Sequence, residues 1–187
     1  MAKRGRLIVI SAPSGCGKTT IAKRLLERNR SLLRSVSYTT RLPRTGEENG
    51  QDYYFISQPE FLRKKRAGFF LESAEVFNRF YGTSKEWVRK QLLDGRNVLL
   101  TIDVQGMKQL RTKMRQSIGM VSVFIMPPSL RVLKSRLAKR RTESKAEIQK
   151  RLKIAEDEMA ARYLYDFTVV NRKIDQAVRE IEDITKL

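Results

Sequence analysis

Residues 12–19 read A-P-S-G-C-G-K-T, and these residue types in this order are typical of a loop that binds phosphate groups. They follow the pattern G-x-x-x-x-G-K-[ST], with Ala12 in place of its first glycine. Glycines let the backbone turn tightly and approach phosphate oxygens closely. Several N–H groups can then converge on the anion at the start of the helix that follows. The segment therefore predicts a nucleotide-binding site.

Lys18 supplies a flexible cation for the β- and γ-phosphates, and the Thr19 hydroxyl is a candidate ligand of Mg²⁺. The alternative is an ordinary helix start, where glycine, serine and threonine are common. A β-rich strand before the loop and an amphipathic helix after it favour the nucleotide site. We predict that ATP and Mg²⁺ bind here, with Ala12, Pro13, Ser14, Gly15, Cys16, Gly17, Lys18, Thr19 and Thr20 around the phosphates.

The chemistry that remains possible is restricted, because the chain has no histidine and one cysteine, Cys16. A Ser–His–Asp triad, a histidine base and a histidine-ligated metal are excluded, and so is an internal disulfide. A helix N-terminus can lower the pKa of a thiol, so Cys16 could be reactive. The alternative, which we favour, is a small side chain that fills space.

Strands and helices alternate along the chain, which predicts an α/β fold with a parallel sheet covered by helices on both faces. Buried strands are expected at residues 6–11, 97–103 and 120–126, and a fourth strand at 167–170. Helices are expected at 18–28, 84–93, 104–115, 129–140, 144–161 and 172–187. The stretch between the first two strands is expected to hold short strands at 35–38, 53–56 and 69–77 and a helix through about residue 66 that a Ser57–Glu60 capping box opens.

The chain has 187 residues, of which 41% are hydrophobic, and this suits one compact domain with a small mobile insert. No apolar run approaches the roughly 18 residues of a membrane span. The N-terminal segment MAKRGRLIVIS is interpreted as a basic tail leading into a core strand, not as a targeting signal. We expect a cytoplasmic protein without a membrane partner.

The net charge of +19 allows two interpretations. A basic surface can bind nucleic acid, or it can attract small polyphosphates while the excess charge remains solvated. No recognition motif for nucleic acid accompanies the charge, so a specific nucleic-acid partner is not expected.

Residues 35–55, S-V-S-Y-T-T-R-L-P-R-T-G-E-E-N-G-Q-D-Y-Y-F, closely resemble the GMP-binding segment of guanylate kinases. That family has T-T-R-x-P-R-x-G-E-x-x-G-x-D-Y there, and every fixed position matches. The match continues in F-L-E at 70–72, Y-G-T at 81–83, I-D-V-Q-G at 102–106 and R-L-A-K-R-R-T-E at 136–143. The resemblance therefore covers nearly the whole chain.

The resemblance implies an acceptor site for GMP. Guanidinium and phenol groups suit a dianionic phosphate, and carboxylate and hydroxyl groups suit the guanine edge. The implied phosphate ligands are Arg41, Arg44, Tyr53 and Tyr81; the implied guanine ligands are Ser37, Glu72 and Thr83, with Asp103 facing the nucleotide. Arg136, Arg140 and Arg151 match lid arginines that reach the transferred phosphoryl group, and Asn171 matches a position near the adenine. Lys18, Arg41 and the three lid arginines are the implied catalytic residues.

The implied reaction is ATP + GMP → ADP + GDP in a P-loop kinase fold. Its core would comprise residues 1–33, 87–135 and 153–187, with a GMP-binding arm at about 34–86 and a lid at about 136–152. Two alternatives remain: a non-catalytic binding module of the same fold, which typically lacks a working phosphate loop, and a basic nucleic-acid-binding protein.

The chain departs from the family pattern at several positions. Thr101 replaces an aspartate, Lys139 and Arg141 replace two lid glycines, and Thr83 stands where serine is frequent. Thr83 can alternatively open a capping box with Glu86, in which case its role would be structural.

Overall fold

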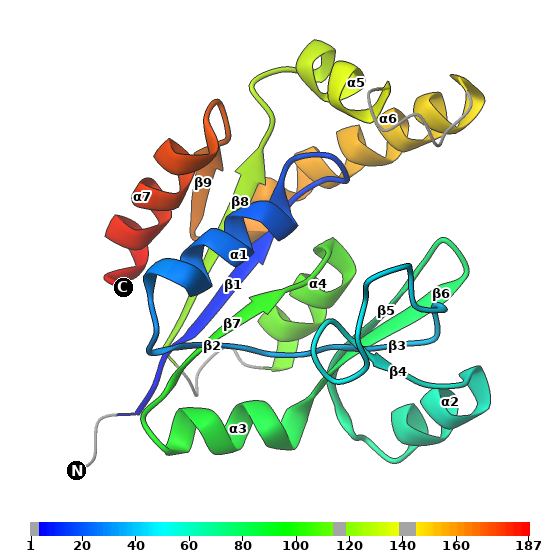
Figure 1. The fold of residues 1–187 in the computed structure, drawn as a ribbon, viewed down its shortest axis with the longest axis vertical. Helices are drawn as coiled ribbons and strands as arrows, with labels where there is room; N and C mark the ends of the chain where they lie inside the picture. Colours follow the sequence, from blue (N-terminus) through cyan, green and yellow to red (C-terminus); the bar gives the residue numbers. More distant parts are fainter. Residues whose placement is uncertain (1–3, 114–118, 139–144) are drawn as a thin grey trace.

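The computed structural model describes residues 4–113, 119–138 and 145–187. Its central sheet has five strands in the order β2-β7-β1-β8-β9, and all neighbouring pairs are parallel (Figure 1). The strands are β1 (Leu7–Ser11), β2 (Leu32–Arg34), β7 (Asn97–Thr101), β8 (Met120–Met126) and β9 (Phe167–Val170). The parallel sheet that the sequence predicts is therefore confirmed.

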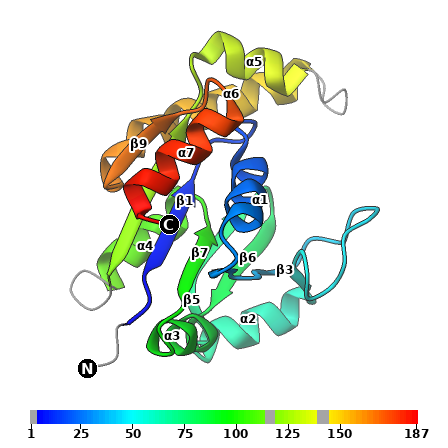
Figure 2. The same ribbon diagram turned by 60° about the vertical axis from the view of Figure 1, so that its left-hand side comes forward.

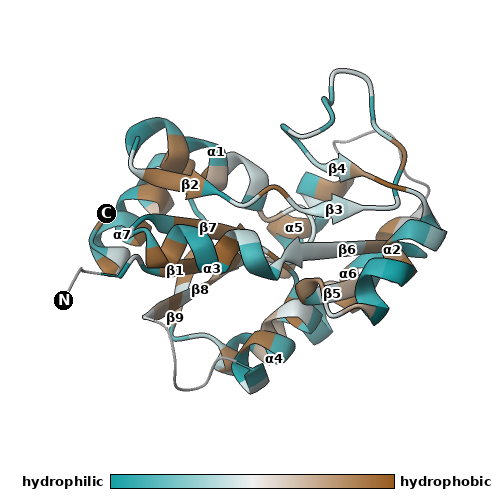
Figure 3. Ribbon diagram, turned by 90° about the horizontal axis from the view of Figure 1, so that it is seen from below, coloured by the Kyte–Doolittle hydropathy of each residue, from teal (hydrophilic) through white to brown (hydrophobic). Residues whose placement is uncertain are grey.

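The two faces of this sheet are covered by different helices, because successive side chains of β1 point to opposite sides. Ile8 and Ile10 belong to one buried cluster with residues of α1 (Lys18–Arg28) and α7 (Ile174–Thr185). Leu7 and Val9 belong to a second cluster with residues of α3 (Lys85–Leu93), α4 (Val104–Lys113) and the 3₁₀ helix η1 (Ala161–Leu164). Figures 2 and 3 show these helices and the hydrophobic strands between them.

A second, smaller sheet lies beside the core and has the strand order β4-β3-β6-β5. Its strands are β3 (Tyr38–Thr39), β4 (Tyr54–Phe55), β5 (Phe70–Val76) and β6 (Arg79–Ser84), and helix α2 (Gln58–Arg66) packs on it. Phe61 of α2 stacks on Phe70 and Phe80 with ring centroids 4.4 and 5.4 Å apart. Ser57 caps α2 as predicted, its hydroxyl accepting a hydrogen bond from Glu60 N.

The prediction of one strand at residues 35–38 is wrong. Residues 32–34 extend the central sheet and residues 38–39 join the second sheet, so the chain passes from one sheet to the other between them. Strand β6 was not predicted. It follows β5 through a tight turn in which Phe77 and Asn78 have φ values of 50° and 57°. Because phenylalanine is rare in that conformation, the sequence carries only a weak turn signal.

Two further helices lie at the end of the core that carries the nucleotide loop (Figure 1). They are α5 (Leu130–Ala138) and α6 (Lys145–Ala160), and Leu133 and Leu137 of α5 are buried in the same cluster as Cys16. The predicted site residue Arg140, with Lys139 and Arg141, falls outside the described residues. Among the helices that the structure describes, no helix combines the length and apolar character of a membrane span.

Candidate active site

The phosphate loop connects β1 to α1 and depends on two glycines. Gly15 and Gly17 have φ values of 89° and 87°, a conformation that side chains disfavour. A Cβ on Gly17 would also lie 2.7 Å from Asn171 Nδ2, which donates a hydrogen bond to Cys16 O at 2.8 Å. The loop conformation therefore requires glycine at residue 17 for two independent reasons.

Lys18 is held at the end of the neighbouring strand β7. Its Nζ donates a hydrogen bond to Ile102 O at 3.1 Å. Burial lowers the pKa of the Lys18 ammonium, whereas the nearby carboxylates of Asp103 and Glu158 act in the opposite direction. The arrangement places one partly buried cation between the loop and the carboxyl ends of the parallel strands, where such sheets bind ligands.

One cleft of about 720 Å³ brings the phosphate loop and the second sheet together. The residues of the loop that line it are 12–15 and 17–20, and those predicted to contact the acceptor are Ser37, Tyr53, Glu72, Tyr81 and Asp103. The exposed Thr19 lies at the start of α1. Within the described residues, no group of three or more Asp, Glu, His or Cys residues could hold a metal ion.

Glu72 is the most deeply buried carboxylate of the cleft, with 4% of its surface exposed. The hydroxyl of Thr83, on the neighbouring strand β6, donates a hydrogen bond to Glu72 Oε1 at 2.6 Å. Burial raises the pKa of Glu72 to about 7, against the effect of this hydrogen bond. The alternative that Thr83 caps α3 is wrong, because the Ser84 hydroxyl accepts from Trp87 N instead.

Arg41 lies against the rings of Tyr53 and Phe55, of which Tyr53 lines the cleft; neither Arg41 nor Arg44 lines it. Arg41 Cζ is 5.3 Å from the ring centroid of Tyr53, whose ring meets that of Tyr81 edge-on at 6.0 Å. Arg41 Nη2 pairs with Glu47 Oε1 at 2.8 Å, and Glu47 Oε2 accepts from the backbone N of Arg44 at 2.8 Å. Glu47, which has no role in the sequence prediction, therefore orders the loop that carries both arginines, and the Arg44 side chain remains exposed.

Arg136 and Arg151, the two described arginines of the predicted lid, contact the core from α5 and α6. Arg136 Nη2 donates to Asn171 O at 3.0 Å, and Arg151 Nη1 donates to Ser14 Oγ at 3.0 Å. The Arg151 guanidinium also lies 5.1 Å from the ring centroid of Phe77, at the β5–β6 turn. Arg151 thus connects helix α6, the phosphate loop and the second sheet, whereas Asn171 is buried against the loop backbone.

Glu158 of α6 lines the cleft and was missed by the sequence analysis. Burial raises the pKa of its carboxyl to about 7, opposed by the charge of Lys18. Arg151, Ile154 and Glu158 all line the cleft and are spaced three and four residues apart, so they share one face of the helix. Glu158 lies seven residues after Arg151, a predicted site residue, and therefore on the same helix face. This spacing is the signal that could have identified Glu158.

The chain matches the family model described as guanylate kinase over residues 4–186. It is 50% identical over 180 residues to a guanylate kinase of Wolbachia sp. subsp. Brugia malayi, covering 96% of this chain and 91% of that relative. It is 46% identical over 182 residues to that of Dechloromonas aromatica, covering 97% and 89%. The crystal structure of guanylate kinase from Anaplasma phagocytophilum superposes with a TM-score of 0.82 at 38% identity, covering 98% of this chain and 86% of that one.

Cys16 should be unreactive in the folded protein. Its side chain is fully buried, and burial raises the pKa of the thiol to about 12, despite the nearby charges of Arg136 and Lys18. We expect an aromatic disulfide reagent at pH 8 to modify far less than one thiol per chain within minutes, and one thiol after denaturation. Rapid stoichiometric labelling of the native protein would show instead that the loop presents a thiolate.

Proposed function

The chain belongs to the guanylate kinase family, and we infer that it transfers the γ-phosphoryl group of ATP to GMP, giving ADP and GDP. The observation that carries this conclusion is the shared cleft. The phosphate loop lines one part of it, and Glu72, with Thr83 behind it, lines another. A donor site for a nucleoside triphosphate therefore faces a buried carboxylate suited to a guanine edge.

We propose that ATP binds with its phosphates on the loop. Backbone N–H groups of residues 14, 15, 17 and 18 and the positive end of α1 attract the anion, and Lys18 adds a charge at the β- and γ-phosphates. The Thr19 hydroxyl would hold Mg²⁺, which keeps most of its water ligands and needs few protein groups. When bound, that ion supplies charge neutralisation at the phosphate oxygens. Asn171 would support ATP binding indirectly, because its side-chain amide donates a hydrogen bond to Cys16 O and so holds the loop backbone.

We propose that GMP binds against the second sheet. The ionised Glu72 can accept hydrogen bonds from guanine N1–H and the N2 amino group, and the hydroxyl of Ser37 is available to the base. The Thr83 hydroxyl would contribute to guanine recognition by holding Glu72 Oε1. Asp103 is in reach of the same nucleotide. Arg41, Arg44, Tyr53 and Tyr81 would hold the phosphate, a role that bidentate guanidinium groups favour.

In the transfer, an oxygen of the GMP phosphate bonds to the γ-phosphorus of ATP as the bond from that phosphorus to the β–γ bridging oxygen breaks. An anionic phosphate oxygen needs no base, which agrees with the lack of histidine. Positioning and charge neutralisation supply the catalysis. We assign the neutralisation to Lys18 and to the lid arginines Arg136, Arg140 and Arg151.

We further propose that residues about 34–86 act as the GMP-binding arm and about 136–152 as the lid, and that both close over the nucleotides. The contact of Arg151 with Ser14 and Phe77 supports this, because it already links the three parts. Closure excludes water from the reacting phosphates.

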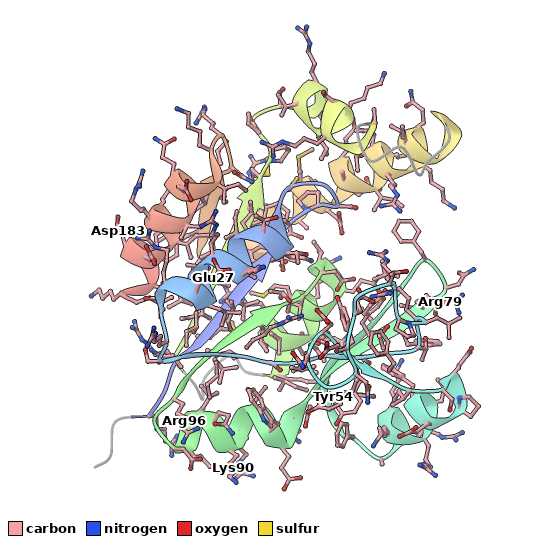
Figure 4. The ribbon with its side chains drawn as sticks, in the orientation of Figure 1. Glu27, Tyr54, Arg79, Lys90, Arg96 and Asp183 are labelled. Carbon is pink, nitrogen blue, oxygen red and sulfur yellow. The ribbon has the colours of Figure 1, made fainter. Side chains whose placement is uncertain are left out.

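The high positive charge favours no second function. In Figure 4, the labelled charged side chains Glu27, Arg79, Lys90, Arg96 and Asp183 lie on separate elements around the outside of the molecule. We propose that the excess charge increases the local concentration of nucleotides, which is a salt-dependent effect.

A coupled assay that measures ADP formation separates the candidate functions. We expect ADP to form in the presence of ATP and GMP together, and not with ATP and AMP, since adenine lacks the N1–H and N2 donors that Glu72 requires. Absence of turnover with every purine monophosphate would favour the binding module.

Lys18→Ala should remove most activity without unfolding the protein. The variant loses the side-chain cation of the loop, and loss of one such transition-state contact typically lowers kcat by about 100- to 1,000-fold. Lys23→Ala, on the exposed face of the same helix, is the matched control and should retain the activity of the unmodified protein. Near-normal kcat in a folded Lys18→Ala variant contradicts the assignment.

Affinity for GMP should depend on the protonation of Glu72. Only the ionised carboxyl accepts both guanine donors, and its pKa in the free protein is about 7. The KM for GMP should therefore rise as the pH falls below 7, approaching about tenfold per pH unit, while the KM for ATP changes little. Glu72→Gln provides the control. The GMP phosphate titrates in assays of both proteins, whereas residue 72 titrates only in the unmodified protein. Identical pH profiles for the two proteins would show that Glu72 does not read the base.

A further inference from the structure

Helix α4 runs alongside β5, which is the edge strand of the second sheet. Three side chains of α4 donate hydrogen bonds to the backbone of β5. Side chains four residues apart on α4 donate to carbonyl groups two residues apart on β5. The pairs are Gln105 Nε2 with Glu75 O (3.0 Å), Gln109 Nε2 with Ser73 O (2.6 Å) and Lys113 Nζ with Leu71 O (3.0 Å). Four helical residues span about 6 Å and two strand residues about 6.6 Å, so the two repeats match.

Of these three contacts, the one between Gln109 and Ser73 has the most hydrogen bonds. Gln109 Oε1 also accepts a hydrogen bond from Ser73 N at 3.1 Å, so its amide group binds both backbone groups of Ser73. A strand at the edge of a sheet has unpaired N–H and C=O groups, and here a side chain takes the place of a further strand. Ser73 follows Glu72 directly, and Lys113 holds the residue that precedes Glu72. The backbone on both sides of the base-reading carboxylate is therefore fixed by α4.

Gly106, on the same helix, lies directly against the Glu72 carboxylate. A Cβ added at Gly106 would be 2.6 Å from Glu72 Oε2 and 3.2 Å from its Cδ. Contacts under 3.0 Å require a shift, and the group that can shift is the end of the Glu72 side chain. The missing side chain at residue 106 thus creates the space that the carboxylate occupies.

The start of α4 is fixed to the nucleotide core. Asp103 Oδ1 accepts a hydrogen bond from Gly106 N at 2.9 Å, and Ile102, just before it, accepts from Lys18. Helix α4 therefore connects the phosphate loop to Glu72 through packed and hydrogen-bonded groups. Figure 1 shows α4 between the central sheet and β5. Strand β5 lies within the proposed arm, yet it is bound to a helix of the core.

We propose that Gly106 and Gln109 are positioning residues for guanine recognition: Gly106 leaves room for the Glu72 carboxylate, and Gln109 fixes the strand that carries it. The proposal rests on the function proposed above and adds to it. Base specificity would depend on the fit between a core helix and the arm, beyond the groups that contact the base.

Gly106→Ala is the principal test. Alanine is a better helix former than glycine, so the fold should persist and the melting temperature should change little. The new methyl group should displace the Glu72 carboxylate from the base. We expect kcat/KM for GMP to fall by about 10- to 100-fold, the preference for GMP over IMP to shrink, and the KM for ATP to stay within about twofold. Gly119→Ala is the matched control, since its Cβ would meet only Arg6 Cγ at 3.6 Å.

Gln109→Glu tests the same proposal independently, and decides it if the alanine variant does not fold. Glutamate keeps the size and the acceptor for Ser73 N, but it places an oxygen against Ser73 O. We expect kcat/KM for GMP to fall about three- to tenfold, again with an unchanged KM for ATP. Lys108→Ala, on the exposed side of α4, should behave as the unmodified protein.

The outcomes separate the two levels of inference. If the unmodified protein does not phosphorylate GMP, the proposed function itself fails. If it does, and folded Gly106→Ala or Gln109→Glu proteins keep the original preference for GMP over IMP, the positioning role is wrong while the function stands. If a substitution weakened the binding of GMP and of ATP by the same factor in KM, it would have damaged the whole site. That result would also overturn the proposal.

Discussion

Two anionic phosphate groups must come into contact in the proposed reaction, and their repulsion is the constraint on which the site depends. The chain offers cationic and N–H groups from several separate elements: the phosphate loop with Lys18, the loop of Arg41 and Arg44, and helices α5 and α6 with Arg136 and Arg151. Phosphoryl transfer asks for little covalent chemistry from the protein. Side chains that neutralise the phosphate charges and orient the two nucleotides are therefore sufficient. A chain without histidine can perform phosphoryl transfer for this reason.

The parallel sheet gives these groups a common meeting place. Strands β1 and β7 are paired in register, so their carboxyl ends reach the same edge and place the phosphate loop beside Ile102 and Asp103. The second sheet presents Glu72 to the same cleft. Burial raises the pKa of this carboxylate, so the recognition of the base that we propose for Glu72 would be linked to pH. Helix α4 connects these two regions, because it begins directly after Asp103 and its side chains hydrogen-bond to β5.

Local patterns predicted much of this arrangement. The phosphate loop and both ends of helix α1 follow from residue types a few positions apart, and four of the five strands of the central sheet follow from apolar runs. The second sheet could not be predicted well, because β3 and β4 have two residues each and the β5–β6 turn uses Phe77 and Asn78. Such short strands are defined by their partners. The pairing of Glu47 with Arg41 and the contact of Gly106 with Glu72 could not be predicted either. These residues lie in segments that match the family pattern, but the pattern does not say which residues contact one another.

The claim that one cleft holds both nucleotides is tested most directly with a bisubstrate ligand, in which adenosine and guanosine are joined through a polyphosphate chain. Titration calorimetry should find one ligand bound per protein chain, with an affinity well above that of either nucleotide, because the second contact is intramolecular. Saturating ATP and saturating GMP should each displace it. Binding of two equivalents, or displacement by only one of the two nucleotides, would contradict a shared cleft and the direct transfer derived from it.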